Sequence, residues 1–251
     1  MPGIEWASGR GGVLKTAHTY ALLAKGDVKV LGLLPYASNY TFLAKVRDGA
    51  SECLAVYKPT RGERPLWDFP EGTLAAREVA AYRVSEAAGW HFVPPTVLRQ
   101  EAPLGPGSLQ LFIEHDPERH YFVLSEERFS ELRNFAAFDV VVNNADRKAG
   151  HVLEDEGGKL WAVDHGVTFH VEPKLRTVIW AYADESLGQD VRAALELLGP
   201  QLDDRAGLGG DLAGLLSPEE SAATLARVET LLVEDHFPSP SSDRPLPWPL
   251  V

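Results

Sequence analysis

Hydrophobic and polar positions alternate with a period close to two along much of the first half of the chain. Five short apolar runs are separated by Gly, Pro and Asn residues, a pattern typical of strands joined by turns. The predicted strands span residues 28–34, 41–46, 53–59, 97–100 and 108–114. Two segments have helical spacing instead, residues 14–25 and 72–88, and Gly89 ends the second of them.

The second half of the chain has a predominantly helical pattern. Inward-facing apolar residues predict a helix over residues 126–143, preceded by a linker at 119–122. Two amphipathic helices are predicted over residues 187–198 and 217–233, and Ser-Pro-Glu-Glu at the start of the second is typical of a capping box. The proline-rich segment 237–251 is predicted to be an extended tail.

Two apolar runs in this half lead into polar clusters that contain an aspartate. The first run leads to Asp146, and the second, residues 160–163, ends at Asp164. Between them lies an acidic turn with two adjacent glycines, residues 154–159, and strand-like residues flank it, so a hairpin is predicted. A hairpin returns the ends of the two runs toward each other. We therefore expect Asp146, His151 and Asp164 to share one small volume.

Composition and charge narrow the class of protein. A chain of 251 residues, 45% hydrophobic and 24% charged, is long enough for one large domain or two lobes with a buried core. The single cysteine, Cys53, excludes an internal disulfide and suits a reducing cytoplasm. No apolar run reaches membrane-spanning length, and we expect no signal peptide. A net charge of −12 repels nucleic acid and anionic lipid, so neither nucleic-acid binding nor membrane contact is expected.

The spacing of the polar residues points to phosphoryl transfer, which needs a carboxylate near the attacking hydroxyl and ligands for divalent metal ions. His151 follows Asp146 at the distance that separates the catalytic aspartate from the metal-binding asparagine of kinases, and Asp164-His165-Gly166 stands where kinases have Asp-Phe-Gly. Either motif alone is also typical of ordinary turns. Because both occur in kinase order, the chain resembles the phosphatidylinositol 3/4-kinase-like branch of the kinase fold, in particular an actinobacterial group, over roughly residues 28–185.

The resemblance implies a role for each motif residue. Asp146 corresponds to the general base or hydroxyl-orienting carboxylate, and Asp164 and His151 correspond to the metal ligands. Lys58, near the end of a predicted strand, would hold the ATP phosphates. Glu78, on the helix that follows, would form an ion pair with Lys58. A histidine in place of asparagine is a softer nitrogen ligand, which makes Mn²⁺ a candidate beside Mg²⁺.

Five further residues complete the predicted nucleotide site. Arg147 and Lys148 would neutralise charge on the transferring phosphate. The turn that replaces a glycine-rich phosphate loop offers Ser38 and Asn39 as phosphate donors, although a plain hairpin turn would have the same composition. Backbone amides from Glu114 onward would meet the adenine at the crossing between the lobes.

We therefore predict an α+β, two-lobed protein-kinase-like fold with a β-rich N-lobe and a helical C-lobe. The N-lobe would span residues 1–114, the C-lobe 115–236 and the tail 237–251. The predicted function is ATP- and divalent-metal-dependent transfer of phosphate to a hydroxyl of a lipid headgroup, protein or metabolite, in the cytoplasm.

Two alternatives remain open. One is a nucleotide-binding pseudokinase with a regulatory or scaffolding role, which the unusual phosphate loop and His151 motivate. The other is transfer of AMP rather than phosphate on the same fold. A metal hydrolase fits less well, because the eight histidines include no His-x-x-x-His pair.

Overall fold

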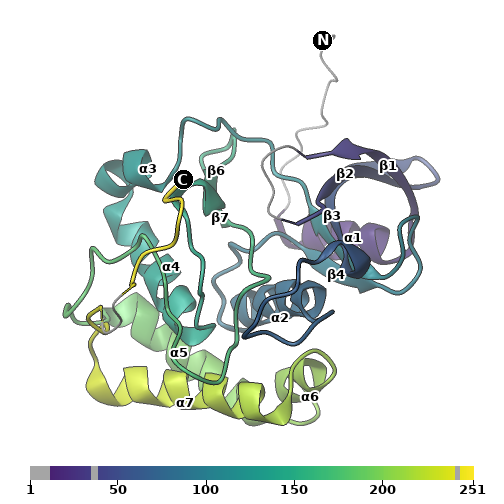
Figure 1. Cartoon of the computed structure of the whole chain (residues 1–251). Helices are drawn as coiled ribbons and strands as arrows, with labels where there is room; N and C mark the ends of the chain where they lie inside the picture. The colour runs from purple at the N-terminus through teal and green to yellow at the C-terminus, as the bar shows by residue number, and fades with distance from the viewer. Residues whose placement is uncertain (1–11, 35–38, 241–243) are drawn as a thin grey trace.

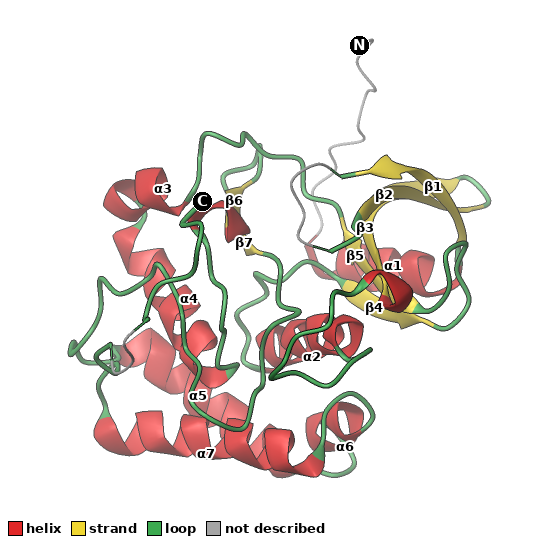
Figure 2. Cartoon of the chain, in the orientation of Figure 1, coloured by secondary structure: helices red, strands yellow, loops and turns green. Residues whose placement is uncertain are grey.

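The computed structural model describes residues 12–34, 39–240 and 244–251, which form a sheet lobe and a helical lobe (Figure 1). Figure 2 shows the larger sheet gathered at one side with helix α1 (Gly12–Lys25), and most of the remaining helices at the other. Helix α2 (Leu74–Ala87) lies between them. Within the described ranges, no helix is both long and apolar enough to cross a membrane. The predicted α+β class is confirmed.

Five antiparallel strands form the main sheet, in the spatial order β1-β2-β3-β5-β4. They are β1 (Asp27–Leu33), β2 (Phe42–Asp48), β3 (Ser51–Pro59), β4 (Thr96–Arg99) and β5 (Gly107–Leu111). All five predicted strands are present. Strand β5 ends at Leu111 rather than at residue 114, because the chain leaves the sheet there to cross to the helical lobe.

The sheet buries one face against α1. Ala44 of β2 opposes Ala55 of β3 in register, and Tyr57 lies on the same face; all three are fully buried with Leu23 of α1. Because successive side chains on a strand point to opposite faces, burying Tyr57 against α1 turns Lys58 to the other face, toward the helical lobe. The strand period thus sets the direction of the predicted phosphate-binding lysine.

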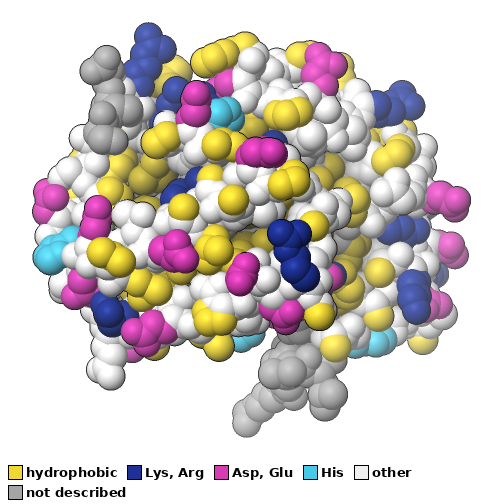
Figure 3. All heavy atoms as spheres, turned by 90° about the horizontal axis from the view of Figure 1, so that it is seen from below, with side chains coloured by type: hydrophobic (Ala, Val, Ile, Leu, Met, Phe, Trp, Pro, Cys, Tyr) yellow, Lys and Arg dark blue, Asp and Glu magenta, His cyan; other side chains and the backbone are white. Residues whose placement is uncertain are grey.

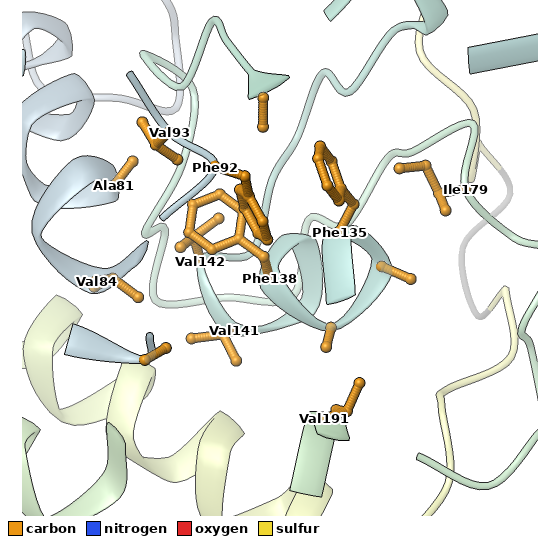
Figure 4. Close-up of a cluster of buried hydrophobic side chains, with 14 of the residues drawn as sticks. Ala81, Val84, Phe92, Val93, Phe135, Phe138, Val141, Val142, Ile179 and Val191 are labelled. Carbon is orange, nitrogen blue, oxygen red and sulfur yellow. The ribbon is translucent and has the colours of Figure 1, made fainter. Parts of the chain in front are cut away.

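The helical lobe contains most of the remaining elements. They are α3 (Tyr121–Glu127), α4 (Phe129–Val141), the hairpin β6 (Val152–Glu154) and β7 (Leu160–Ala162), α5 (Gln189–Asp203), α6 (Leu208–Ala213) and α7 (Pro218–Glu234). Its core centres on α4, where the ring of Phe92 stacks on Phe135 and meets Phe138 edge-on (Figure 4). The ring centroid of Phe92 lies 4.2 Å from that of Phe135 and 5.2 Å from that of Phe138. Such aromatic contacts add stability beyond the buried area.

The single helix predicted over residues 126–143 does not begin where the structure has it. The structure has two helices, α3 and α4, with a break at Arg128, and residues 121–122 of the predicted linker are already part of α3. Arg128 leaves helical geometry (φ −125°, ψ 29°), and its guanidinium binds Glu131 and Glu154. Helix α5 continues past the predicted end at residue 198, and the glycine-rich helix α6 was not predicted.

The face of the molecule nearest α7 carries acidic side chains without gathering them in one patch. Figure 3 shows Asp and Glu side chains on this face scattered among hydrophobic and basic ones.

The capping box predicted at the start of α7 is present and also anchors α2. Ser217 Oγ accepts from the Glu220 amide at 3.2 Å, and Glu220 Oε2 accepts from the Ser217 amide at 2.9 Å. The other oxygen of Glu220 accepts from the guanidinium of Arg77 on α2 at 2.5 Å. Arg77 is 1% exposed, donates to Thr168 O and lies over the ring of Phe69. One buried arginine therefore ties α2 to the helical lobe.

We expect Arg77→Ala to lower the free energy of unfolding by about 3 kcal/mol, because it leaves a mostly buried carboxylate without its charged partner. Arg192→Ala, an exposed helical arginine paired with Glu196 and Asp235, serves as the matched control and is expected to cost less than about 1 kcal/mol. Urea denaturation of both variants measures the difference. Equal losses would show that the Arg77 contact contributes no more than a surface pair.

Candidate active site

A cleft of about 380 Å³ lies between the two lobes. Apolar side chains from both lobes form part of its lining, including Val56, Phe112 and Leu153. Charged and titratable side chains form another part: Lys58, Glu78, His151 and Asp164. An apolar cleft of this size with a few converging polar groups is typical of a small-molecule site.

Lys58 is the centre of a charged group that joins the lobes. Its amine forms an ion pair with Glu78 of α2, and it lies 2.8 Å from Asp164 Oδ1. The other oxygen of Glu78 accepts from the His165 amide at 3.0 Å, so both oxygens of this buried carboxylate are bonded. Burial opposes the charge of Lys58, but Asp164 and Glu78 outweigh it and raise the pKa of the amine. The predicted Lys58–Glu78 ion pair is confirmed.

The hairpin brings His151 and Asp164 together, as the sequence predicted. His151 Nε2 lies 3.3 Å from Asp164 Oδ2. Asp164 has a positive φ of 62°, an uncommon conformation for a non-glycine residue and one that aspartate tolerates better than most. Burial would raise the pKa of Asp164, but the charge of Lys58 and its hydrogen bond lower it below its ordinary value. The carboxylate is therefore held in its charged form.

Burial controls the protonation of His151. It lowers the pKa of the imidazole to about 4, although Asp164 acts in the opposite direction. Nδ1 accepts from the Lys148 amide at 3.3 Å, which leaves the proton of the neutral ring on Nε2, facing Asp164. To bind a metal through Nε2, the ring must move that proton.

Asp146 lies beside the cleft rather than in its lining. Its carboxylate is 36% exposed, and Oδ2 lies 3.2 Å from the amine of Lys148. Burial raises the pKa of Asp146, and the charge of Asp164 adds to this, while Lys148 and Arg176 oppose it. The amide of Asp146 donates to Asn144 Oδ1, which fixes the start of the loop. Asp146 can therefore accept a proton more readily than an ordinary aspartate.

The expectation that Arg147 faces a transferring phosphate is wrong. Its side chain is fully buried and binds Asp139 of α4 through Nε and Nη2, at 2.8 to 3.1 Å. It also donates to Val163 O at 2.9 Å and to His165 Nε2 at 2.8 Å. Because an arginine has no acceptor, His165 Nε2 must carry a lone pair here. Arg147 therefore links α4 to the segment 163–165 and does not line the cleft.

The predicted nucleotide contacts of the N-lobe have different outcomes. Ser38 lies outside the described residues. Asn39 lines the cleft, but its side-chain oxygen accepts from the Arg64 amide at 2.8 Å and so shapes the loop. Glu114 is exposed and absent from the lining, whereas the neighbouring Ile113 and His115 are part of it. The crossing segment therefore approaches the cleft through the residues on either side of Glu114.

Two acidic residues at the site were not predicted. Glu63 lines the cleft and accepts from the amides of Leu74 and Ala75 at 3.3 and 3.1 Å, which satisfies the N-terminus of α2. No local pattern reveals it, because the contact spans a loop. Asp139 is the buried partner of Arg147. Its signal was available, since a single carboxylate in the otherwise apolar run around it requires a buried partner.

The donor set fits a divalent metal only in part. Across the described ranges, no group of three or more His, Cys, Asp or Glu side chains is arranged to hold a metal ion. Asp164 and His151 supply two donors that face the cleft. Two protein ligands are enough for a Mg²⁺ or Mn²⁺ ion whose other ligands are phosphate oxygens and water. The chain therefore fits a metal that arrives with a nucleotide better than a resident one.

Comparison with curated proteins identifies the family. The chain is 39% identical over 269 aligned positions to Protein Rv2133c of Mycobacterium tuberculosis (strain ATCC 25618 / H37Rv), which covers 92% of this chain and 94% of that protein. The chain belongs to the Rv2133c family. No protein-family model matches this member of the Rv2133c family.

A second curated relative is more distant. Phosphatidylinositol 4-kinase gamma 4 of Oryza sativa subsp. japonica is 29% identical over 184 positions, which cover 65% of the Rv2133c-family chain. The match spans only 32% of the length of the rice protein.

Solved structures show that the Rv2133c-family chain has a kinase-like fold. The Golgi casein kinase with Mn/ADP bound has a TM-score of 0.57 at 12% identity, covering 89% of this chain and 76% of that one. Hydra Fam20 with sugar has a TM-score of 0.55 at 14% identity, covering 89% and 88%. The Helicobacter pylori proinflammatory kinase CtkA has a TM-score of 0.52 at 9% identity, covering 86% and 94%. The predicted kinase-like fold is confirmed.

The low pKa of His151 predicts acid sensitivity of the fold. An unfolded chain binds this proton near pH 6.5, whereas the folded protein binds it near pH 4, so protons favour the unfolded state between these values. We expect the unfolding free energy of the metal-free protein to fall between pH 7 and pH 5, with His151 contributing about 1–2 kcal/mol of the decrease. His151→Asn should reduce this decrease. Denaturant unfolding at both pH values, in chelator, measures it.

His18→Asn is the control, because His18 is exposed and bonds only Ser51 Oγ among the described residues. Its pH dependence should match that of the wild type. A His151→Asn protein with an unchanged pH dependence would contradict the buried neutral state.

Proposed function

We propose that this protein is an ATP- and divalent-metal-dependent phosphotransferase that acts on a hydroxyl group. The observation that carries the proposal is the single amine of Lys58, shared by Glu78 and Asp164 inside a cleft between two lobes. A strand lysine paired with a helix glutamate, next to a metal-binding aspartate, is the constellation that kinases require for activity.

Each residue then has a role that its surroundings support. Lys58 holds the nucleotide phosphates, and Glu78 keeps the amine in place. Asp164 and His151 hold the metal, which neutralises charge on the phosphates. Asp146 orients the acceptor hydroxyl and takes its proton, a role that its raised pKa favours.

Several finer assignments belong to the proposal. Lys148, paired with Asp146, contributes positive charge near the transferred phosphate. Ser38 and Asn39 border the phosphates, and the backbone around Glu114 borders the adenine. The N-lobe ends near residue 114 and the tail begins near 237. These assignments extend the kinase pattern to loops that shape the cleft from the N-lobe side.

The metal and the acceptor are proposed from chemistry and likeness. The neighbouring Golgi casein kinase structure holds Mn/ADP, and a nitrogen ligand such as His151 makes Mn²⁺ a candidate beside Mg²⁺. The rice relative supports membership of the phosphatidylinositol 3/4-kinase-like branch, and the Fam20 neighbour is described with a sugar. The acceptor is a hydroxyl on a lipid headgroup, a protein or a metabolite. The acidic surface favours a cytoplasmic protein that contacts neither nucleic acid nor membrane.

We expect Asp164→Ala to weaken metal-dependent ATP binding by more than about tenfold, because it removes the carboxylate that faces both Lys58 and His151. Calorimetric titration with ATP and Mg²⁺ or Mn²⁺ measures the affinity. Asp48→Ala, at an exposed strand end, is the control and should bind like the wild type. Equal affinity in Asp164→Ala and wild type would remove Asp164 from the metal site.

Radiolabelled ATP distinguishes the proposed reaction from its alternatives. With Mn²⁺ and cell extract separated into protein, lipid and small-molecule fractions, we expect label to be transferred from the γ-phosphate. Asp146→Asn should lower the rate by roughly 10²–10⁴-fold without changing ATP affinity, since it removes the proton acceptor. Transfer from the α-phosphate would indicate AMP transfer. Tight ATP binding with no transfer of either label would indicate a pseudokinase.

A further inference from the structure

The proline-rich segment 244–251 folds back onto the catalytic loop, although it contains no helix or strand. Figure 1 shows the C-terminus close to strand β6 of the hairpin, which the Ala149–His151 turn precedes. The Ala149 amide donates to Leu250 O at 2.7 Å. Pro245 O accepts from the Thr177 amide and from the Trp180 indole nitrogen, both at 3.1 Å. The segment therefore contacts both the Ala149–His151 turn and the separate segment around Thr177 and Trp180.

The bonded groups belong to the site rather than to a distant surface. Ala149 is fully buried and begins the 3-10 turn Ala149–His151, which presents the His151 ring to Asp164. A buried amide without an acceptor is costly, so the turn depends on Leu250 O. On the other side, Thr177 Oγ1 donates to Asp139, the buried partner of Arg147.

The segment is held by packing as well as by hydrogen bonds. The Leu250 side chain packs against the main core of the helical lobe, and Pro247 is buried. Leu246, by contrast, is 47% exposed. Leu250 therefore anchors the segment to the core, whereas Leu246 does not. Packing of Leu250 fixes the carbonyl that the Ala149 amide requires.

We propose that residues 244–251 are a positioning segment of the active site, and that Leu250 holds the Ala149–His151 turn so that His151 faces Asp164. The role in metal binding rests on the proposed function. The role in ordering the turn does not, because it follows from the Ala149 amide and its acceptor alone.

Leu250→Ala and Leu246→Ala, made in the full chain, are a matched pair for testing this segment. We expect Leu250→Ala to speed hydrogen exchange of the Ala149 amide, measured by NMR, by roughly tenfold or more, while α2 amides keep their wild-type rates. Its Mn²⁺-dependent ATP affinity should fall about fivefold, the equivalent of one hydrogen bond, while metal-free ATP affinity stays unchanged. Leu246→Ala should behave like the wild type in every measurement.

Faster exchange throughout the chain in Leu250→Ala, or equal effects of both leucine variants, would overturn the proposal. If Leu250→Ala fails to fold, Trp180→Phe replaces it, because it removes only the indole bond to Pro245 O. This variant should also speed Ala149 exchange without changing α2, and unchanged exchange would overturn the proposal. A wild type that binds no Mn²⁺·ATP would refute the proposed function, and the exchange measurements would still decide whether the segment orders the turn.

Discussion

The architecture of the candidate site depends on one buried ion pair, between Asp139 of α4 and Arg147 of the loop that follows this helix. Both side chains are fully buried, so each charge needs the other, and every remaining donor needs an acceptor. Arg147 meets this need with the carbonyl of Val163 and the ring of His165, while Asp139 also accepts from Thr177. The requirement to satisfy one buried guanidinium thus joins α4, the loop that carries Arg147, the segment 163–165 and the segment around Thr177.

In the cleft, the charged side chains are arranged around Lys58, which forms ion pairs with Glu78 and Asp164. Lys58 faces two carboxylates, and its raised pKa records that excess of negative charge. One oxygen of Asp164 faces Lys58 and the other faces His151. A metal bound to this carboxylate would therefore share it with the lysine. In the function we propose, a nucleotide that brings its own metal would supply phosphates for Lys58 and positive charge for Asp164.

The curated relative and the structurally similar kinases support different conclusions about this chain, the first its family and the second its fold. At 39% identity over nearly the whole chain, membership of the Rv2133c family follows directly. The kinases with similar structures share only 9–14% identity, so what they have in common is the fold. Two ion pairs that cross the lobes, Lys58 with Asp164 and Arg77 with Glu220, connect the two parts of this fold. Chemistry has to be argued from such pairs, because fold alone does not specify it.

The sequence by itself determined the strands and most of the helices, because strand period and turn composition are local properties. It predicted the meeting of His151 and Asp164 through the hairpin, whereas the pairing of Lys58 with Glu78 was implied by the resemblance to kinases. Only the tertiary structure decided which charges face the cleft. Arg147 and Lys148 are adjacent in sequence, yet one is buried against Asp139 and the other reaches Asp146. The return of residues 244–251 to the Ala149–His151 turn was likewise hidden, since a backbone carbonyl that satisfies a distant amide has no signature in side-chain pattern.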